Sequence, residues 1–255
     1  MELPIEYRRT AQTKKRARCE SLGMWLVSGM RSDQHSQSDR KENLVSVLVL
    51  IGAILLSVLS FFGDQAVIAW MQAHRTPNGM HFAAFVSKYG DWPALTLYAA
   101  IAFLLAWWRN NRVLSKIIVG MLVALAIEGA VQYPLCSLTG RARPNNTEAK
   151  QEWNGPWRDG KLSLLENKYH SFPSGHTGGS FAFFGVLCFA WRRYGWLFLP
   201  IAALIGWSRI YLNVHHLSDV VVGMFLGLFI AWLVEHWLYR SRPTSPPENS
   251  RRKFA

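Results

Sequence analysis

The chain has 255 residues, of which 50% are hydrophobic, and a formal net charge of +12. The hydrophobic residues form long blocks instead of an amphipathic pattern, which argues against a soluble protein with one or two buried helices. The Lys and Arg residues gather in the two terminal segments and in short segments between these blocks, which argues against nucleic-acid binding and favours a membrane protein.

Residues 1–43 are mostly charged and polar, and we expect them to form a basic cytoplasmic tail. Residues 44–62 are almost free of charge and long enough to cross a hydrocarbon core of about 30 Å. Similar stretches follow at about residues 93–108, 117–133, 177–191, 196–212 and 220–238. We therefore predict an all-α, polytopic membrane domain of about six helices in a bundle over residues 44–239, followed by a disordered basic cytoplasmic tail over residues 240–255.

The basic segments alternate along the predicted spans, so all of them fall on one side of the membrane. The positive-inside rule makes this side cytoplasmic, and both termini with it. The loops at residues 63–92, 134–176 and 213–219 then share the opposite face. We expect this face to be periplasmic, with the protein in a bacterial inner membrane.

Three polar clusters fall on the non-cytoplasmic side, each where a hydrophobic stretch meets a loop. They are Gly140-Arg141-Ala142-Arg143-Pro144, then Pro173-Ser174-Gly175-His176, then Ser208-Arg209 followed by His215 and Asp219. Arginines, a hydroxyl, a glycine amide, two histidines and a carboxylate are suited to holding a phosphate and breaking its ester bond. The sequence therefore predicts a phosphate-directed active site at this membrane face.

Asp219 lies four residues after His215, a spacing that places both side chains on one face if the segment is helical. The carboxylate can then hold the imidazole in one tautomer, and such an imidazole is a competent nucleophile toward phosphorus that gives a phosphohistidine. The alternative is that both residues cap or hydrate the start of the last span. His216, at the next helical position, would point roughly 100° away from Asp219, so we expect it to be structural.

Pro173-Ser174-Gly175-His176 directly precedes a hydrophobic run, where a helix start offers free N–H groups and the positive end of its dipole to a phosphate. Ser174 adds a hydroxyl donor, and Gly175 lets the backbone approach closely. His176 is suited to protonating the leaving oxygen and later taking a proton from water. The alternative is an ordinary N-cap and turn.

Arg143 offers a planar, permanently charged fork that matches phosphate oxygens. Arg141, two residues earlier, is a second phosphate contact, a headgroup contact or a solvated loop charge, and we favour the latter two. Because the cysteines suggest no disulfide and no metal-binding motif is present, we expect neither a disulfide nor a cofactor. Nothing in the sequence fixes the oligomeric state.

These motifs resemble the signature of the type-2 phosphatidic acid phosphatase superfamily, the integral-membrane lipid phosphate phosphatases. That signature reads Lys-x6-Arg-Pro, Pro-Ser-Gly-His and Ser-Arg-x5-His-x3-Asp, and the resemblance covers about residues 62–238. It implies a six-helix bundle and metal-independent chemistry. By the same resemblance, His215 is the nucleophile, Asp219 orients it and His176 is the general acid and base. Phosphate-binding roles fall on Arg143, Ser174, Gly175 and Arg209.

Only the end of the first motif is matched, by Arg143-Pro144, and Cys136 occupies the position of the family's lysine. Because a neutral thiol cannot replace an ammonium group beside a phosphate dianion, either Arg141 or Lys168 supplies the charge, or activity is reduced or lost. The implied substrate is a lipid phosphate in the bilayer: polyprenyl pyrophosphate, phosphatidylglycerol phosphate, phosphatidic acid or a lipid A phosphate. The alternatives to a hydrolase are a lipid phosphotransferase that uses the same phosphohistidine, and a catalytically inactive lipid-binding or partner-binding membrane protein.

Overall fold

The computed structural model describes residues 44–149, 151–158, 161–162 and 164–240, so both predicted tails lie outside the described residues. The chain divides into two units, Met1–Leu55 and Leu56–Ala255. In the first unit, residues 44–55 are helical and begin a helix, Leu44–Ala73, that runs on into the second. The residues of the candidate site belong to the second unit, and the domain boundaries predicted at residues 43 and 240 stay predictions.

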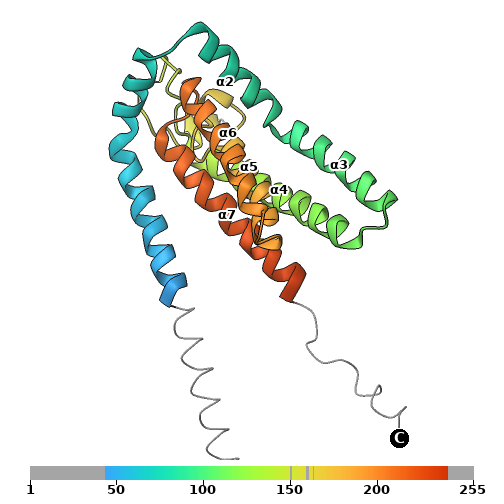
Figure 1. Cartoon of the computed structure of the whole chain (residues 1–255). Helices are drawn as coiled ribbons and strands as arrows, with labels where there is room; N and C mark the ends of the chain where they lie inside the picture. The colour runs from blue at the N-terminus through green and yellow to red at the C-terminus, as the bar shows by residue number, and fades with distance from the viewer. Residues whose placement is uncertain (1–43, 150, 159–160, 163, 241–255) are drawn as a thin grey trace, which may run out of the picture. The chain divides into compact units, whose positions relative to one another are not determined.

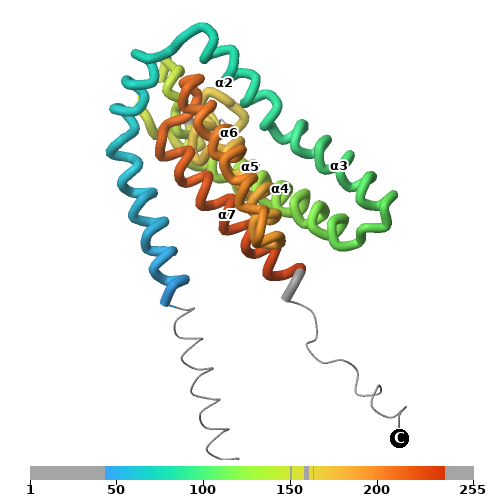
Figure 2. Tube along the Cα trace, in the orientation of Figure 1, coloured from blue at the N-terminus to red at the C-terminus, as the bar shows by residue number. Residues whose placement is uncertain are grey.

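The second unit is mostly helical, and its elements can be followed in Figures 1 and 2. After the first helix come α2 (Pro77–Tyr89), α3 (Trp92–Trp108), α4 (Arg112–Thr139), α5 (Gly175–Ala190), α6 (Leu199–Tyr211) and α7 (Leu217–Arg240). The connection from α4 to α5 holds two short antiparallel strands, β1 (Trp157–Arg158) and β2 (Lys161–Leu162), and the 3-10 helix η1 (Asn167–Tyr169). A second 3-10 helix, η2 (Gly195–Phe198), leads into α6.

The six hydrophobic stretches largely coincide with helices, in line with the predicted all-α class. Within the described residues, three helices are long and apolar enough to cross a bilayer: Leu44–Ala73, Arg112–Thr139 and Leu217–Leu238. The pair α2 and α3, bent by 55° at a short break, would make a fourth. Because α5 has only 16 residues and Gly195–Tyr211 is also short, the number of six crossings stays a prediction.

The central helix of the second unit is α5, which packs against α4, α6 and α7. Glycines permit the close approach to α7, because a Cβ at Gly227 would lie 2.2 Å from the Gly178 carbonyl oxygen of α5. Apolar side chains fill the space around this helix, among them Leu125, Val186 and Val234. The N-terminus of α5, which carries the Ser-Gly-His sequence, is therefore held firmly by its neighbours.

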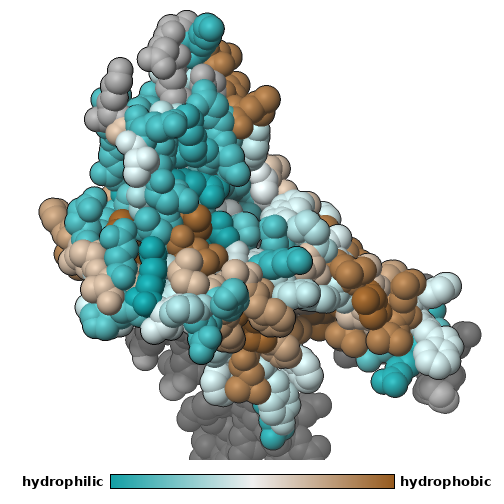
Figure 3. Space-filling view, turned by 90° about the horizontal axis from the view of Figure 1, so that it is seen from above, coloured by the Kyte–Doolittle hydropathy of each residue, from teal (hydrophilic) through white to brown (hydrophobic). Residues whose placement is uncertain are grey.

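The outer faces of the helices expose large hydrophobic side chains, for example Leu97, Leu104 and Trp107 in α3. Viewed from above, hydrophilic side chains gather over the loop end of the protein, whereas hydrophobic ones cover the part where α3 extends away from it (Figure 3). A contiguous apolar exterior of this kind is costly in water and suits lipid. The chain is therefore a membrane protein.

Three connections meet at the loop end of the second unit: the break between α2 and α3, the segment from α4 to α5, and the loop from α6 to α7. Gly140 turns the chain out of α4 with a φ of 57°, in the left-handed region that favours glycine. The segment that follows brings Arg141 and Arg143 back over the end of the bundle. This end of the protein holds all three polar clusters.

Candidate active site

His215 lies in the loop between α6 and α7 and is buried. Its Nδ1 atom lies 2.7 Å from the Ser171 carbonyl oxygen. Because a carbonyl oxygen can only accept a hydrogen bond, Nδ1 carries the proton and donates it, which leaves the lone pair on Nε2. The backbone at Ser171 thus fixes the tautomer that a nucleophilic imidazole needs.

Asp219, in the first turn of α7, has its Oδ2 atom 3.6 Å from Nδ1 of His215. The predicted pair is therefore close in space, but the shorter contact of His215 is with Ser171. The same Oδ2 atom accepts hydrogen bonds from the Ser171 hydroxyl at 2.6 Å and from the His216 N–H at 2.8 Å. Asp219 thus fixes Ser171 by a hydrogen bond, and Ser171 in turn orients the ring of His215.

The prediction that His216 points away from Asp219 is wrong. Nδ1 of His216 lies 3.2 Å from Asp219 Oδ2, closer than Nδ1 of His215. The reason is that α7 begins only at Leu217, so helical spacing does not govern the two histidines before it. His216 lines a separate cavity of about 470 Å³ and is not among the residues that line the cavity of His215.

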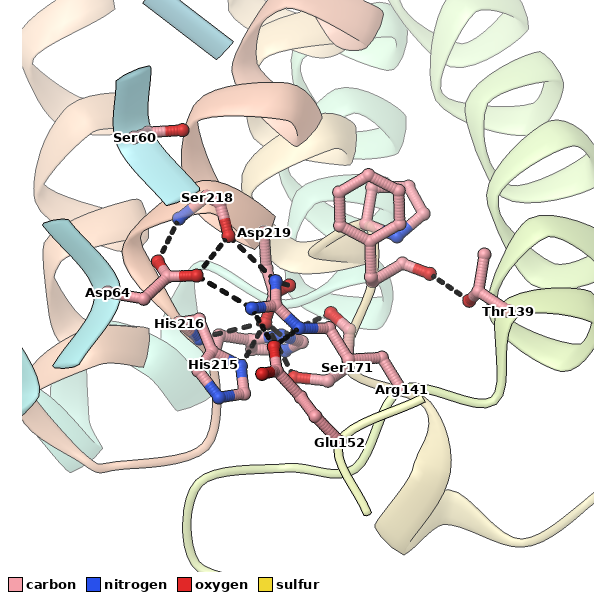
Figure 4. Close-up of polar contacts among 12 residues, drawn as sticks. Ser60, Asp64, Thr139, Arg141, Glu152, Ser171, His215, His216, Ser218 and Asp219 are labelled. Atoms are coloured by element: carbon pink, nitrogen blue, oxygen red, sulfur yellow. Dashed lines mark hydrogen bonds and ion pairs between the residues drawn. The ribbon is translucent and has the colours of Figure 1, made fainter. Parts of the chain in front are cut away.

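Arg141 is the buried centre of an ion-pair network, shown in Figure 4. Its guanidinium contacts the carboxylates of Asp64 in the first helix, Glu152 in the loop and Asp219 in α7. The side chain is 1% exposed, and its guanidinium carbon lies 4.7 Å from the centre of the Trp153 ring. These contacts exclude the solvated loop charge that the sequence favoured as one role of Arg141.

The network keeps Arg141 positively charged. Burial alone would lower the pKa of Arg141, but the carboxylates around it, Asp219 foremost, raise that pKa above its ordinary value. Across the described part of the chain, no group of three or more His, Cys, Asp or Glu side chains is arranged to hold a metal ion. In this network the guanidinium is the cation that the carboxylates share.

His215 shares a cavity of about 510 Å³ with His176 and Arg143. Further lining residues come from the α2–α3 break, from α4 and from the segment before α5, and sequence reasoning missed them: Asp91, Trp92, Gly129, Gln132, Tyr133, Asn167 and His170. The sequence predicts only that the loops carrying most of these residues lie on one side of the membrane. It does not identify any of these residues individually.

His176 is the second residue of α5 and brings a second histidine–carboxylate pair to the cavity. Its Nε2 atom lies 3.3 Å from Oδ1 of Asp91, the residue that caps the N-terminus of α3. His176 and His215 are thus neighbours in one cavity, each beside a carboxylate. This arrangement suits one histidine for attack and the other for proton transfer.

Arg143 and Arg209 bring positive charge to the two histidines. Arg143 donates through Nη2 to Asn167 Oδ1 at 2.8 Å, and Arg209 donates through Nη1 to the Ser87 hydroxyl. In both guanidinium groups the Nε atom is buried and has no hydrogen-bond partner. Because a buried donor without an acceptor is costly, especially on a cation, these two N–H groups indicate an anion site.

Ser174 and Gly175 lie at the start of α5, as the sequence predicts. Gly175 lines the cavity, and a Cβ at this position would lie 2.9 Å from Cδ of Gln132. Ser174 is fully buried, and its hydroxyl shares a hydrogen bond of 3.0 Å with that of Thr177. The first N–H groups of a helix have no partner within it, so the start of α5 offers donors and a positive dipole end to an anion.

Cys136 is buried in α4 and is not among the residues that line the cavity. Its thiol donates to the Pro173 carbonyl at 3.3 Å. Neither of the loop cations considered as replacements for the family's lysine lines the cavity. Arg141 is engaged in its network, and Nζ of Lys168 pairs with Glu148 at 2.7 Å.

The surroundings keep His215 neutral. Burial lowers the pKa of His215 to about 4, although the Asp219 carboxylate acts in the opposite direction. The charges of Arg209 and Arg143 add to the lowering. A neutral imidazole is the form that can act as a nucleophile, and burial keeps His215 in this form at neutral pH.

The apolar helices, and the histidines and arginines gathered at one end, define a helical membrane protein with positively charged side chains beside a neutral histidine. Comparison with known proteins narrows this class of membrane protein to one family, because residues 117–243 match the PAP2 superfamily. The chain belongs to the PAP2 superfamily, the type-2 phosphatidic acid phosphatases that its motifs resemble.

Several known proteins are similar to the chain. It is 30% identical over 177 residues to the probable diacylglycerol pyrophosphate phosphatase 1 of Schizosaccharomyces pombe, covering 58% of the chain and 61% of that protein. It is 24% identical over 200 residues to the lipid A 1-phosphatase of Rhizobium johnstonii, covering 73% of the chain and 77% of that protein. For the S. pombe protein and for the probable lipid phosphate phosphatase 4 of Arabidopsis thaliana, the chain spans 61% and 54% of their lengths.

Two solved structures share the fold. One is the crystal structure of a transmembrane PAP2 type phosphatidylglycerolphosphate phosphatase from Bacillus subtilis, with a TM-score of 0.58 and 18% identity over 76% of this chain and 98% of that one. The other is that of Aquifex aeolicus LpxE, with a TM-score of 0.51 and 19% identity over 67% of this chain and 93% of that one. At such identities the likeness concerns the fold alone.

Proposed function

We propose that the protein is a membrane-embedded lipid phosphatase that hydrolyses a lipid phosphate through a phosphohistidine on His215. The observation that carries this proposal is the cavity in which a neutral imidazole with its lone pair on Nε2 lies beside His176 and Arg143. Relatives named as diacylglycerol pyrophosphate, lipid A and phosphatidylglycerophosphate phosphatases support a phosphorylated lipid as the substrate class.

The phosphate enters with its charge facing the two arginines. The unpaired Nε–H groups of Arg143 and Arg209 donate hydrogen bonds to its oxygens, and the first N–H groups of α5 add donors near Gly175. Ser174 stabilises the start of α5 through the hydrogen bond between its hydroxyl and that of Thr177. Donors fixed before the reaction stabilise the charge that grows on the equatorial oxygens in the transition state.

In the first step, Nε2 of His215 attacks phosphorus and the bond to the leaving oxygen breaks, while His176 gives that oxygen a proton. In the second step, water attacks the phosphohistidine, His176 takes the proton of the water, and inorganic phosphate leaves. Both histidines then return to their starting states. No metal ion or other cofactor has a part in this scheme.

Asp219 acts at one remove from the attacking atom. Its carboxylate accepts a hydrogen bond from the Ser171 hydroxyl. The Ser171 carbonyl oxygen in turn accepts a hydrogen bond from the Nδ1–H group of His215. Its negative charge also favours the positive imidazole that forms when Nε2 bonds to phosphorus. Asp219 therefore orients the nucleophile and stabilises it after attack.

The cavity opens at the loop end of the protein, which we assign to the non-cytoplasmic face. The segment from α4 to α5 lies at this end, and the basic segments 109–116 and 192–193 flank the other ends of α4 and α5. By the positive-inside rule these basic segments are cytoplasmic. The substrate is then a lipid of the outer leaflet of a bacterial inner membrane, with its headgroup at the periplasmic surface.

The test is phosphate release by the detergent-purified protein from a panel of lipid phosphates, with EDTA present. We expect the wild type to release phosphate and His215→Ala to lose at least about a thousandfold in rate, because the nucleophile is gone. His81→Ala is the matched control, because His81 lies exposed on α2. Phosphate release by His215→Ala at the wild-type rate would overturn the proposal, and transfer to a second lipid without free phosphate would make the protein a phosphotransferase.

A further inference from the structure

A further small cavity lies at the end of the helices opposite the candidate site. Its volume is about 210 Å³, and it lies where the chain beyond α5 meets the C-terminal part of α7, two helices that pack against each other (Figure 1). Six side chains line it: Cys188, Phe189, Arg192, Trp232, Glu235 and His236. None of the six lines the cavity of His215, so the proposed phosphatase reaction does not use them.

The fold fixes both sides of this small cavity. Just before it, α5 and α7 approach closely, because a Cβ at Gly185 would lie 2.7 Å from the Cβ of Ala231. Just after α5 the chain makes a tight turn, in which the Gly195 N–H donates to the Trp191 carbonyl at 2.7 Å. Arg192 lies within this turn, so its backbone is held in place beside the C-terminal part of α7.

The small cavity lies at the level of lipid headgroups. Glu235 is roughly 27 Å along α7 from Leu217, because an α-helix rises about 1.5 Å per residue. This distance is close to the thickness of the hydrocarbon core, about 30 Å. Trp232 and Trp237 are exposed on the same part of α7, and tryptophan gathers at the membrane interface. The charged side chains of the cavity are therefore within reach of the headgroups of one leaflet.

Arg192 and Glu235 bring opposite charges to the small cavity without neutralising each other. In the described part of the chain, neither side chain forms an ion pair or a hydrogen bond with another residue. The ring of His236 has a different neighbour, the Trp232 ring, at a centroid distance of 5.5 Å. A ligand that satisfies this cavity must therefore offer a negative group to the guanidinium and a positive group to the carboxylate.

We propose that the small cavity binds the headgroup of a phospholipid that carries a phosphate and a primary ammonium group, as phosphatidylethanolamine does. The fork of Arg192 suits phosphate oxygens, and the carboxylate of Glu235 accepts hydrogen bonds from the ammonium group. A cavity of about 210 Å³ is small beside the sites of drug-sized ligands, so it suits a compact headgroup.

The surroundings favour a lipid over the free headgroup, phosphoethanolamine. Large apolar side chains are exposed next to the cavity on α7, among them Phe229 and Leu233, and acyl chains can cover them. A lipid held by Arg192 and Glu235 connects the end of α5 with α7. Because a ligand that binds only the folded protein stabilises it, the bound lipid should stabilise the pairing of these two helices.

The experiment compares phospholipids with identical acyl chains and different headgroups. Delipidated protein in maltoside micelles receives phosphatidylethanolamine, phosphatidylglycerol or phosphatidylcholine at equal mole fraction. Native mass spectrometry measures the lipid that stays bound, and thermal unfolding gives the melting temperature. We expect phosphatidylethanolamine to bind at least about tenfold more tightly than phosphatidylglycerol and to raise the melting temperature by ~3 °C or more, because its headgroup satisfies both charges.

Two further ligands define the chemistry. Phosphatidylcholine should bind less tightly than phosphatidylethanolamine, because its trimethylammonium group is larger and donates no hydrogen bond. Free phosphoethanolamine at the same concentration should leave the melting temperature unchanged, because it gains no contact with the apolar side chains.

The informative variant is Glu235→Gln, which keeps the size of the side chain and removes its charge. We expect its retention of phosphatidylethanolamine to fall to the level of phosphatidylglycerol. In Arg192→Gln all three phospholipids should be lost more readily, because the phosphate contact is gone. Arg193→Gln is the matched control: Arg193 is exposed and carries the same charge one position along, but it does not line the cavity. This control should keep the wild-type preference.

Four results would overturn this inference. They are equal retention of phosphatidylethanolamine and phosphatidylglycerol by the wild type, an unchanged preference in Glu235→Gln, equally tight binding of phosphatidylcholine, and an equal thermal shift with free phosphoethanolamine. The last would assign the cavity to a soluble ligand. Because Glu235 lies at the far end of α7 from His215, an effect of its variant does not arise in the candidate active site. The inference therefore stands or falls independently of the proposed phosphatase activity.

Discussion

His215 depends on a backbone carbonyl for its tautomer and on a carboxylate for its charge balance. The carbonyl of Ser171 accepts the Nδ1 proton at 2.7 Å, whereas Asp219 lies 3.6 Å from the same atom. The orientation of the ring therefore follows the path of the loop before α5, and the hydroxyl of Ser171, bonded to Asp219, fixes that path. The spacing of the motif identifies His215 and Asp219, but it does not predict that Ser171 is hydrogen-bonded to both of them.

At this scale we expect His215 to make the folded protein less stable in mild acid. In the unfolded chain the imidazole titrates near pH 6.5, whereas burial lowers its pKa in the folded protein to about 4. Between these values the unfolded state binds more protons, so the contribution of His215 to stability is complete above about pH 6.5 and is lost as the pH falls toward about 4. The loss amounts to at most roughly 3 kcal/mol.

The measurement is the melting temperature in detergent between about pH 7 and about pH 4.5. We expect a fall in the wild type and a smaller fall in His215→Gln, whose amide does not titrate. His81→Gln, on the exposed face of α2, is the control and should keep the wild-type dependence. If His215→Gln lost as much stability in acid as the wild type, the buried neutral imidazole would not be the cause.

Among the elements, the loop after α4 owes its path over the site to a single residue at the end of that helix. Gly140 has a φ of 57°, and a Cβ there would lie 2.2 Å from the Gly155 carbonyl oxygen. Because backbone atoms cannot retreat as a flexible side chain can, we expect Gly140→Ala to lower the free energy of unfolding by about 2 kcal/mol or more. Activity should fall as well, because the loop with Arg141 and Arg143 is displaced.

The matched variant for Gly140→Ala is Gly52→Ala in the first helix. A Cβ at Gly52 meets no atom within 4 Å, and alanine is a better helix former than glycine. We therefore expect an unchanged or slightly higher melting temperature for Gly52→Ala and a clearly lower one for Gly140→Ala. Equal melting temperatures would show that the left-handed turn and the close contact with Gly155 are unimportant.

The sequence predicts where helices lie better than where they end. The hydrophobic stretches coincide with helices, but the first helix continues to Ala73 and α4 continues to Thr139, beyond the predicted ends at residues 62 and 133. Helices extend past the apolar run because polar residues at these ends find partners in the fold, as Asp64 does with Arg141. The helix α2 was not predicted at all, because its thirteen residues form no long apolar block.

The site is predicted in part. The motifs identify His176, His215 and Arg143, which the fold brings to one cavity. They give no hint of Asp91, because a single carboxylate in a loop carries no pattern and its position depends on the bend between α2 and α3. The role of Arg141 was missed for a similar reason, since its partners lie far from it in sequence and meet only in the folded protein.

For the molecule as a whole, we expect the loop end and the Arg192–Arg193 end to lie on opposite sides of the membrane. In a background in which Cys19 and Cys188 are replaced by serine, Lys161→Cys in β2 and Arg193→Cys beyond α5 report on the two ends. Both positions are exposed. A membrane-impermeant maleimide should label Lys161→Cys in intact spheroplasts and Arg193→Cys only after permeabilisation. The reverse pattern would contradict the assigned orientation.

The network around Arg141 also sets an order of events during synthesis. Asp64 and Ser218, which are hydrogen-bonded to each other, are 154 positions apart in the sequence. Arg141 comes 78 positions before its ion-pair partner Asp219. While the ribosome is still producing α6, the guanidinium has only its earlier and local partners, and the loop that presents Arg143 lacks its anchor in α7. On the proposed function, we therefore expect the nascent protein to be unable to cleave a lipid phosphate until its last helix, which carries Asp219, has been inserted.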